Sequence, residues 1–557
     1  MINHLEFNFG ASNITTGHLA FQPGPMTVFV GPNNSGKSLV LREIEQWLYN
    51  PGSHFPPKII KEIGLSRLSK KEVLDHAFGP SKILHPAAVP ANYGIDVRIG
   101  NSLSKTSSKT HISVRTLYEG FAGNAYVGDY KKVFAFSYTI RLDGQTRLSL
   151  TREQKAGDLL ERPINHLAAL FVNPDALKRL RELSEDAFGL YFVIDPTSVG
   201  TLRVKMSSRP PIDLNEEQGL GPKSRDFHRQ AISIEDLSDG VKAFTGLTAA
   251  MLSGNYRLIL VDEPEAFLHP PLARKLGKVL TQTAYSRGAS VFASTHSPEF
   301  LMGCIQAGNP VNVVRLTYQA ERATARFLSS AELEHLMRDP LLRSTGILNA
   351  LFHTGAVVCE GDIDRALYEE VNARLAQTGE GLADILFLNA IGKQTLHRIV
   401  APLRKMGIPT AAVVDLDILK EGDLAALLRA AYVPDQLIDS WSNLKRRIYE
   451  KFKELDVDPK KSGIGILDGE SQEIALNLID NAAAYGIFIV PVGEVESWLS
   501  DLGATGTKTK WIESLFDLMG SDPSSPQYLR PSAGDVWDFM RRVARWIGDP
   551  QRKGIPG

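Results

Sequence analysis

The chain has 557 residues, of which 43% are hydrophobic and 22% are charged. This is the composition of a globular protein, and the length exceeds what one hydrophobic core supports, so we expect two to four domains. Its 62 Lys and Arg residues nearly balance its 63 Asp and Glu residues. That balance argues against a simple basic nucleic-acid-binding module but allows a local basic groove.

Three further features indicate the cellular compartment. No apolar run approaches the roughly 18 to 20 residues that a bilayer span needs, and the start, MINHLEFNFG, lacks the pattern of a signal peptide. Cys304 and Cys359 are the only cysteines in the sequence, too few for a disulfide framework. We therefore expect a cytoplasmic α/β protein that has no membrane partner.

A phosphate-binding loop follows the first strongly predicted strand. MTVFV (26–30) has β character, GPNNSGKS fits the pattern GxxxxGK[ST], and LVLREIEQWL has helical spacing. Backbone N–H groups of such a loop surround phosphate oxygens, its lysine reaches the β- and γ-phosphates, and its last residue binds Mg²⁺. We predict that ATP binds here through Gly31, Pro32, Asn33, Asn34, Ser35, Gly36, Lys37 and Ser38.

The stretch between this loop and residue 257 predicts a mixture of elements. Residues 88–150 are β-rich with a hairpin turn at Asp143-Gly144, residues 152–190 have helical spacing, and residues 207–225 are turn-rich and predict a loop. No heptad pattern is long enough for a coiled-coil arm. We therefore expect a compact helical insert at about 152–225.

Three later segments carry further nucleotide chemistry. In RLILVDEP (257–264), a predicted strand ends at Asp262, which would enter the Mg²⁺ shell, and at Glu263, which would stand beside the attacking water. A second predicted strand, ASVFASTH (289–296), ends at His296. The segment LSDG (237–240) opens a predicted helix.

Together these segments resemble the RecF/SMC-like ABC ATPases, which also place LHP after the Asp-Glu-Pro motif, as at 268–270 here. The resemblance covers about residues 1–320. The LSDG segment is similar to the ABC-type signature LSGGQ, with Asp239 and Val241 where the strict signature has Gly and Gln.

The resemblance implies an arrangement of subunits as well as a fold. In that family the signature of one subunit contacts the γ-phosphate held by the other, so ATP is sandwiched in a head-to-tail dimer. It implies that Ser238 and Gly240 take this signature role and that His296 senses the γ-phosphate. A homodimer or higher homo-oligomer is therefore expected.

A second alternation of strands and helices begins at residue 356. Strands are predicted at 356–359, 385–388, 410–415 and 487–491, with helices at 363–376, 393–406 and near 510–519 and 534–547. Acids follow three of these strands: Glu360 and Asp364, then Asp415 and Asp417, then Glu494 and Glu496.

These acids predict a metal site, because strand ends in a parallel sheet meet at one edge. Oxygen ligands without His or Cys suit Mg²⁺ or Mn²⁺, and two such ions can activate water and stabilise the leaving oxygen in phosphodiester cleavage. For any single pair of these acids, the alternative is that the side chains are solvated at a strand end and bind no ion.

The pattern Glu-Gly…Asp followed by Asp-x-Asp resembles a Toprim domain, and NALFHTGAVVCEG resembles the entry to the Toprim half of the OLD (overcoming lysogenization defect) family. That family comprises ATPase–nuclease fusions used in phage defence. It implies further acids, which Glu494 and Glu496 match, and a catalytic lysine, for which Lys508 and Lys510 are both candidates. No topoisomerase tyrosine and no zinc-ribbon cysteines are assignable, which favours hydrolysis.

The fold class expected is α/β: an ABC/RecF-like ATPase domain (1–350) with a helical dimerisation insert, a Toprim domain (351–535) with a Rossmann-like parallel sheet, and a C-terminal helix and tail (536–557). We expect an ATP-regulated, Mg²⁺- or Mn²⁺-dependent endonuclease that cleaves DNA in anti-phage defence, with a helicase or another defence protein as a candidate partner. Two alternatives stay open: the same machinery acting on RNA or tRNA, and an ATP-gated sensor or scaffold whose acids hold a structural ion.

Overall fold

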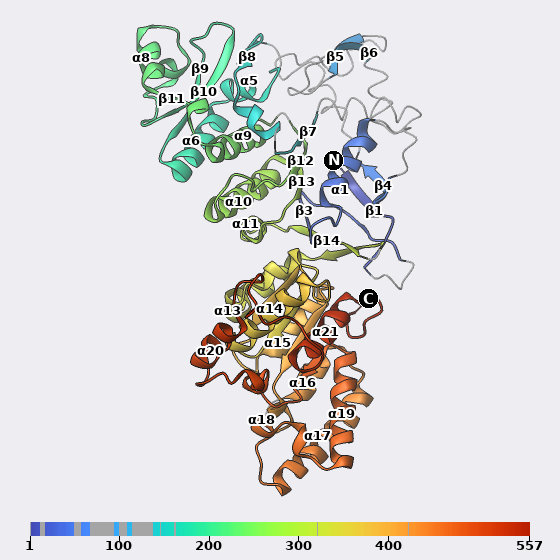
Figure 1. The fold of residues 1–557 in the computed structure, drawn as a ribbon. Helices are drawn as coiled ribbons and strands as arrows, with labels where there is room; N and C mark the ends of the chain where they lie inside the picture. The colour runs from blue at the N-terminus through green and yellow to red at the C-terminus, as the bar shows by residue number, and fades with distance from the viewer. Residues whose placement is uncertain are drawn as a thin grey trace.

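The computed structural model describes residues 2–11, 17–49, 57–66, 94–99, 108–113, 138–144, 146–160, 163–254, 256–319, 321–420 and 423–556. They form an N-terminal half (residues 2–346) and a C-terminal half (residues 347–556), which follow one another along the long axis of Figure 1. None of the described helices combines the length and the apolar character that crossing a bilayer requires.

A six-stranded sheet organises the N-terminal half. Its order is β15-β14-β3-β13-β12-β7, and every neighbouring pair is parallel except β14 and β15. The strands are β3 (Met26–Val30), β7 (Thr139–Leu142), β12 (Leu258–Asp262), β13 (Ser290–Ser294), β14 (Asn312–Gln319) and β15 (Arg322–Leu328). Strands β3 and β13 are buried at every position, which fits their mostly apolar sequences, MTVFV and SVFAS.

Helices and a small sheet cover both faces of this sheet. One face packs against α1 (Lys37–Tyr49) and the antiparallel strands β1 (Ile2–Phe7), β2 (Ala20–Phe21) and β4 (Ile60–Leu65). The other face packs against α9 (Asp239–Ser253), α10 (Pro270–Arg287) and α11 (Pro298–Ile305). Strands β5 (Gly94–Ile99) and β6 (Ser108–Ser113) form a separate antiparallel pair. Most of the predicted β-rich stretch at 88–137 lies outside the described residues.

The hairpin predicted at Asp143-Gly144 was wrong. The chain leaves β7 and enters the 3₁₀ helix η2 (Thr146–Thr151) instead of returning as a strand. Asp143 Oδ1 accepts a hydrogen bond from the Thr146 backbone N–H at 2.9 Å, which is how an aspartate starts a helical turn.

The insert (residues 154–236) contains the predicted helices but also a sheet that the sequence did not reveal. Strands β8, β9, β10 and β11 are antiparallel, and the stretch 207–225, predicted as a loop, contains α7 and the start of α8. The elements are β8 (Gln154–Lys155), α5 (His166–Phe171), α6 (Pro174–Phe188), β9 (Tyr191–Asp195), β10 (Thr201–Ser207), α7 (Leu214–Gln218), α8 (Pro222–Gln230), β11 (Ile232–Ser233) and η3 (Ile234–Asp236).

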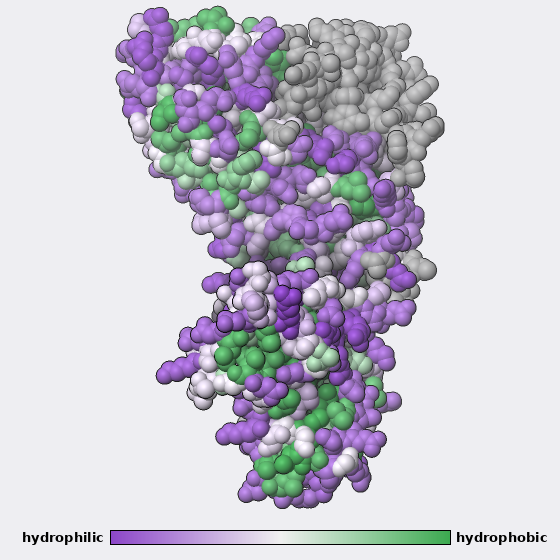
Figure 2. Space-filling model, viewed as in Figure 1, coloured by the Kyte–Doolittle hydropathy of each residue, from purple (hydrophilic) through white to green (hydrophobic). Residues whose placement is uncertain are grey.

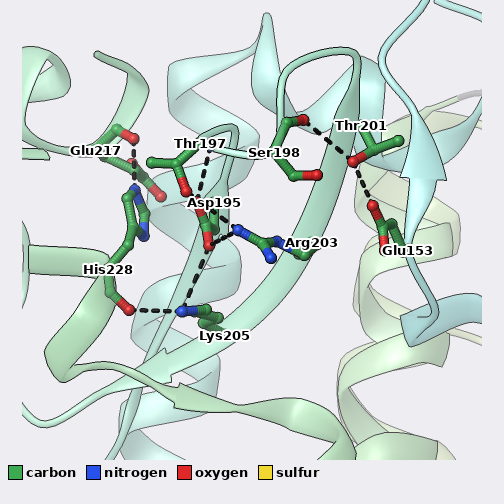
Figure 3. Close-up of polar contacts among 9 residues, drawn as sticks. All are labelled: Glu153, Asp195, Thr197, Ser198, Thr201, Arg203, Lys205, Glu217 and His228. Atoms are coloured by element: carbon green, nitrogen blue, oxygen red, sulfur yellow. Dashed lines mark hydrogen bonds and ion pairs between the residues drawn. The ribbon is translucent and has the colours of Figure 1, made fainter. Parts of the chain in front are cut away.

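Ion pairs centred on a buried aspartate join β9 and β10 within the insert (Figure 3). Asp195 is fully buried and lies 2.8 Å from Arg203 Nη2 and 3.4 Å from Lys205 Nζ. It also accepts hydrogen bonds from the backbone and hydroxyl of Thr197. Because a buried carboxylate is costly unless it is paired, this network fixes the alignment of the two strands.

The C-terminal half is built on an all-parallel sheet in the order β17-β16-β18-β19. Helices α14, α20 and α21 pack on one face, and α15, α16, α17 and α19 on the other. The strands are β16 (Gly355–Cys359), β17 (Ile385–Asn389), β18 (Thr410–Val414) and β19 (Ile487–Ile489). The helices are α14 (Asp362–Gln377), α15 (Leu396–Lys405), η5 (Leu416–Leu419), α16 (Leu424–Ala430), α17 (Asp435–Glu454), α18 (Pro459–Ser462), η6 (Ile464–Ile466), α19 (Gly469–Ala484), η7 (Val495–Ser497), η8 (Ser500–Leu502), α20 (Thr509–Met519) and α21 (Asp535–Gly548).

No polar linker separates the two halves. One cluster of buried apolar residues runs from the first sheet through Ile347, Leu348 and Leu351 into the second. These residues belong to η4 (Ile347–Phe352), which follows α12 (Ser330–Arg338) and α13 (Pro340–Ser344) and spans the expected boundary at 350. Helix α21, predicted as a separate C-terminal segment, buries Trp537 in the core of the second sheet.

The surface is unevenly polar. On the face shown in Figure 2, apolar residues gather over the insert and over the lower C-terminal half, while hydrophilic residues cover most of the remainder. Three large apolar side chains of the insert are more than four-fifths exposed: Leu160, Val199 and Ile212.

Candidate functional site

The phosphate loop (residues 31–38) has two positions that favour glycine. Gly31 has a φ of +145° and Gly36 a φ of +94°. A Cβ atom on Gly31 would lie 2.0 Å from the Leu316 carbonyl oxygen, and one on Gly36 would lie 2.7 Å from Ile59 Cδ1. The glycines therefore allow the tight turn after β3 that starts α1 at Lys37, and a helix start of this kind suits phosphate oxygens.

Lys37 is buried within this loop. Its Nζ donates hydrogen bonds to the carbonyl oxygens of Gly31 at 2.9 Å and Pro32 at 2.7 Å. Burial lowers the pKa of Lys37 to about 8, although the charges of Glu263 and Asp262 oppose this effect. A cation held mainly by carbonyl dipoles is stabilised when a phosphate arrives.

Asp262 contacts Ser38, as expected of two residues that share the Mg²⁺ of a nucleotide. Ser38 Oγ donates to Asp262 Oδ1 at 2.9 Å, and Ser294 Oγ hydrogen-bonds the same oxygen. Strand β13 lies between β3 and β12, so the parallel sheet brings the ends of all three strands to one edge.

Glu263 and His296 face one another at the rim of this site. His296 Nε2 lies 3.9 Å from Glu263 Oε1, and both side chains are partly exposed. Burial and the nearby charge of Lys37 lower the pKa of His296, which favours the neutral form of its ring. These positions suit the predicted roles beside a γ-phosphate.

Two further residues of the nucleotide site were missed. Arg147, fully buried in η2, donates to the carbonyl oxygens of Glu263 at 2.5 Å and Asp262 at 3.0 Å, which holds the turn after β12. Glu265 Oε1 accepts the His296 backbone N–H at 2.8 Å, while its Oε2 is buried without a hydrogen bond. Burial raises the pKa of Glu265. Of these two missed residues, only Glu265 lies near a sequence motif, because it follows Glu263 by two residues.

The signature segment lies at the surface, at the start of α9. Ser238 is the N-cap residue, and its exposed side chain makes no hydrogen bond within the described part of the chain. A Cβ atom on Gly240 would lie 2.8 Å from the Phe267 carbonyl oxygen, so this glycine lets α9 approach the turn after β12. A role of these residues toward a second subunit stays a prediction.

The carboxylate cluster (Glu360, Asp415 and Asp417) lies at the C-terminal edge of the second sheet. Glu360 follows β16, and the two aspartates follow the neighbouring strand β18. One carboxylate oxygen from each lies within 4.8 Å of the others, and the Asp415 backbone N–H donates to Glu360 Oε1 at 3.1 Å. Strands β17 and β18 lie on opposite sides of β16, so the chain connections diverge at this point of the sheet. Ligands commonly bind at such divergence points.

The cluster accumulates negative charge in a poorly solvated place. Burial, followed by the charge of Asp415, raises the pKa of Glu360 to about 8. Burial also raises the pKa of Asp415 to about 7, although an ion pair with Lys460 opposes it. Asp417 Oδ1 is buried and has no hydrogen-bond partner among the residues that the structure describes. Convergent carboxylates with an unpartnered oxygen fit a divalent cation with hard oxygen ligands.

The other predicted acids surround this cluster. Asp364, in the first turn of α14, accepts the Gly361 backbone N–H at 2.9 Å. Burial, together with the charge of Glu496, raises the pKa of Asp364. Burial and Glu496 also raise the pKa of Glu494. The charge of Asp364 helps to raise the pKa of Glu360 and Asp415, and none of the three acids joins the compact set of ligand atoms.

Two lysines contact the cluster, and neither was predicted. Lys460 Nζ lies 2.8 Å from Asp415 Oδ2 and 3.7 Å from Glu494 Oε2, and Lys393 Nζ lies 2.9 Å from Asp417 Oδ2. Gly493 brings Lys460 into place, because a Cβ there would lie 2.1 Å from the Lys460 carbonyl oxygen. Lys393 follows β17, a strand-end position that could have indicated it.

The two lysines predicted from the sequence lie at the start of α20. Lys508, with a φ of +52°, precedes α20, and Lys510 lies in its first turn. Both are exposed, and neither forms an ion pair with a described residue. Their catalytic role stays a prediction.

Family models match two separate parts of the chain. Residues 140–302 match an AAA ATPase domain (AAA_21) whose description also names the AbiEii toxin of a type IV toxin–antitoxin system. Residues 351–417, which include the whole carboxylate cluster, match the Toprim domain of overcoming lysogenization defect protein-like sequences. The chain thus carries an AAA ATPase domain followed by an OLD-like Toprim domain, which is the order of domains in an OLD-type ATPase–Toprim fusion. The fold class and the family resemblance expected from the sequence are thereby confirmed.

Solved structures add only a distant likeness to this ATPase–Toprim fusion. An Smc head bound to the C-terminal winged-helix domain of ScpA is 14% identical, with 61% of this chain and 99% of that chain covered and a TM-score of 0.34. The SMC head domain from Thermotoga maritima is 14% identical (59% and 98% covered, TM-score 0.29), and an ABC transporter ATP-binding cassette in its ADP conformation is 12% identical (62% and 98%, TM-score 0.27). No curated protein matches the chain.

Proposed function

We propose that this chain is an ATP-regulated, divalent-metal-dependent endonuclease that cleaves DNA in anti-phage defence. The observation that carries the proposal is the carboxylate cluster: three carboxylates converge within 4.8 Å at the divergence point of a parallel sheet, inside the region that matches an OLD-like Toprim domain. The ATPase domain in the same chain supports nucleotide control.

At the cutting site, Glu360, Asp415 and Asp417 would hold Mg²⁺ or Mn²⁺. A bound ion of this kind lowers the pKa of water and stabilises the leaving oxygen of a phosphodiester. Lys460 and Lys393 offset part of the cluster's charge and are placed to contact a phosphate oxygen. Asp364, Glu494 and Glu496 add negative charge that favours a second cation beside the first.

At the nucleotide site, Lys37 and the phosphate loop bind the phosphates, and Ser38 and Asp262 hold the accompanying Mg²⁺. Glu263 orients the attacking water, and His296 contacts the γ-phosphate. The exposed Ser238 leaves the signature available to a second copy, and the exposed apolar side chains of the insert also suit self-association.

Cleavage assays test the catalytic part of the proposal. Supercoiled plasmid and total RNA are incubated with the full-length protein in Mg²⁺, Mn²⁺ or EDTA, beside the Asp415→Ala variant. Metal-dependent cutting of plasmid that Asp415→Ala abolishes supports the proposal. Cutting of RNA alone supports the tRNA or RNA alternative. No cutting of either, with normal ATP hydrolysis, supports the sensor or scaffold alternative.

Two variants test the nucleotide control. Glu263→Gln should bind ATP but hydrolyse it slowly, whereas Lys37→Ala should weaken ATP binding itself. If bound ATP biases the state of the cutting site, these variants shift nuclease activity in opposite directions from the wild type. Equal nuclease rates for all three proteins, with and without ATP, would show that the ATPase does not control cutting.

The assembly is tested by native mass measurement. A chain whose signature serves the ATP of another copy must form at least a dimer in the presence of ATP. A monomer with and without ATP would contradict the ABC-type arrangement.

A further inference from the structure

Four arginines surround a cavity where the two halves meet. Arg315 lies on β14, Arg322 and Arg326 lie on β15, and Arg552 follows α21. The cavity encloses about 100 Å³, and none of the described residues that line it is acidic. Figure 1 places the C-terminal end of the chain beside β14 at this junction. We call these four residues and their cavity the arginine pocket.

Three of the guanidinium groups are held by backbone carbonyl oxygens rather than by carboxylates. Arg315 Nη1 and Nη2 donate to the carbonyls of Gly407 at 3.2 Å and His353 at 2.9 Å. Arg326 Nη1 donates to the carbonyl oxygen of Lys405 at 3.0 Å. Arg552 Nη2 donates to the carbonyl oxygen of Ile547 at 2.7 Å. The groups are thus fixed in position before any ligand binds.

The positive charge of the pocket is not neutralised by ion pairs. None of the four arginines forms an ion pair with any residue that the structure describes; Asp384, the acid that acts on Arg315 from a distance, instead bonds His353 at 2.8 Å. Burial, followed by the charges of Arg326 and Arg552, lowers the pKa of Arg315 to about 9. An anion in the cavity would relieve this repulsion.

We propose that the arginine pocket binds a phosphate group, carried either by a free phosphate compound such as pyrophosphate or a nucleotide, or by a nucleic-acid backbone. Guanidinium forks match the paired oxygens of phosphate, and the fixed geometry limits the entropy lost on binding. The cavity has room for a phosphate group beside the four guanidinium groups.

The position of the pocket gives such a ligand access to both halves of the molecule. Pro32 of the phosphate loop lines the cavity from one side, and Thr354, directly before β16, lines it from the other. A phosphate held there would therefore contact segments that lead to the nucleotide site and to the carboxylate cluster. This inference does not depend on the proposed nuclease activity.

The test uses full-length Lys37→Ala protein in EDTA, so that neither the phosphate loop nor a metal at the carboxylate cluster contributes to phosphate binding. Pyrophosphate is titrated at constant ionic strength while heat of binding and the midpoint of thermal unfolding are measured. We expect saturable binding that raises the midpoint. Arg322→Gln, added in this background, should weaken the affinity about tenfold, because a charge-assisted hydrogen bond is lost.

Arg322 is suited to this test because its side chain is exposed and makes no hydrogen bond to a described residue, so its loss does not endanger folding. Arg225→Gln, an equivalent charge change on the exposed face of α8, is the matched control and should leave affinity unchanged. Absence of saturable binding, or equal affinity with and without Arg322, would overturn the proposal and leave the arginines as contacts between the halves.

The source of the phosphate is distinguished by a second titration. A short DNA duplex without terminal phosphates replaces pyrophosphate, and Arg322→Gln and Arg225→Gln are compared again. Dependence on Arg322 for the duplex assigns the pocket to a nucleic-acid backbone, and dependence for pyrophosphate alone assigns it to free phosphate compounds. If the affinity for neither ligand depends on Arg322, the proposal fails.

Discussion

The phosphate loop and the carboxylate cluster occupy equivalent places, each at the C-terminal ends of neighbouring parallel strands, but they have opposite electrostatic needs. In the loop, a buried cation, Lys37, is held by two carbonyl oxygens, and Asp262 is hydrogen-bonded by two serines. In the cluster, Glu360 and Asp415 have raised pKa values and an oxygen of Asp417 is unpartnered. The first site therefore favours an anion, and the second favours a cation.

This difference indicates how one chain can keep two phosphate chemistries apart. In the proposed function a nucleotide would bring its own negative charge to a preformed cation, whereas a metal would first have to displace protons from the cluster. The two sites can therefore be damaged separately, and the following predictions run from the largest expected effect to the smallest.

Asp417→Asn should produce the largest effect, because it removes a charged ligand from the cluster while keeping its shape. We expect metal-dependent cleavage to fall by more than the roughly 10- to 100-fold that loss of an outer-shell partner costs. ATP hydrolysis should be unchanged, since the nucleotide site lies in the other sheet. Asp362→Asn, an exposed position in the first turn of α14, is the control for a nearby charge change. Loss of both activities in folded protein would show that the two sites are not separable.

Lys37→Ala should weaken ATP binding by about 10- to 100-fold, because a charge-assisted contact with phosphate is worth roughly 1.5 to 3 kcal/mol. The nucleotide-free protein should not be destabilised, because the buried ammonium group has a lowered pKa and no carboxylate partner in direct contact. Fluorescent-nucleotide titration and thermal unfolding measure the two effects. A large fall in stability without nucleotide would mean that Lys37 mainly supports the loop.

Lys460→Met should reduce cleavage at pH 7 by about tenfold. Loss of its ion pair raises the pKa of Asp415 further, so that protons compete better with the metal. Lys508→Met and Lys510→Met are made in parallel, since the sequence indicated these lysines and the structure places Lys460 at the cluster. Cleavage rates at several Mg²⁺ concentrations rank the three variants. A larger loss of cleavage in Lys508→Met or Lys510→Met than in Lys460→Met would restore the sequence-based assignment.

The smallest effect concerns pH and stability without metal. The folded-state pKa of Glu360, about 8, exceeds its ordinary value of 4.5, so folding takes up a proton. This contribution to stability is complete below about pH 4.5 and is lost as pH rises to 8; Asp415 behaves likewise between 3.8 and 7. Unfolding midpoints in EDTA should therefore fall by a few degrees over this window, and saturating Mg²⁺ should reduce the fall. If a double variant with Asp415→Asn and Glu360→Gln shows an equal fall in the unfolding midpoint, that fall is due to other titratable groups.

What the sequence determined by itself was local or followed from one rule of sheet geometry. The phosphate loop is contiguous, so its glycines and Lys37 can be recognised without knowing the fold. The meeting of Glu360 with Asp415 and Asp417 follows because residues after parallel strands share one edge. Strand and helix periodicity predicted the four strands of the second sheet, whereas the ATPase and Toprim assignments came from the resemblance of the motifs to known families.

Only the tertiary structure decided which other residues join these sites. Lys460 reaches Asp415 because Gly493 lets α18 pack against the loop after β19, and Arg147 reaches the turn after β12 from η2. The arginine pocket depends on segments more than 200 residues apart in the chain, such as Arg326 and Pro556, whose sequence separation is 230. Contacts of this kind carry no local periodicity, because they arise from packing between elements and not from the spacing within one.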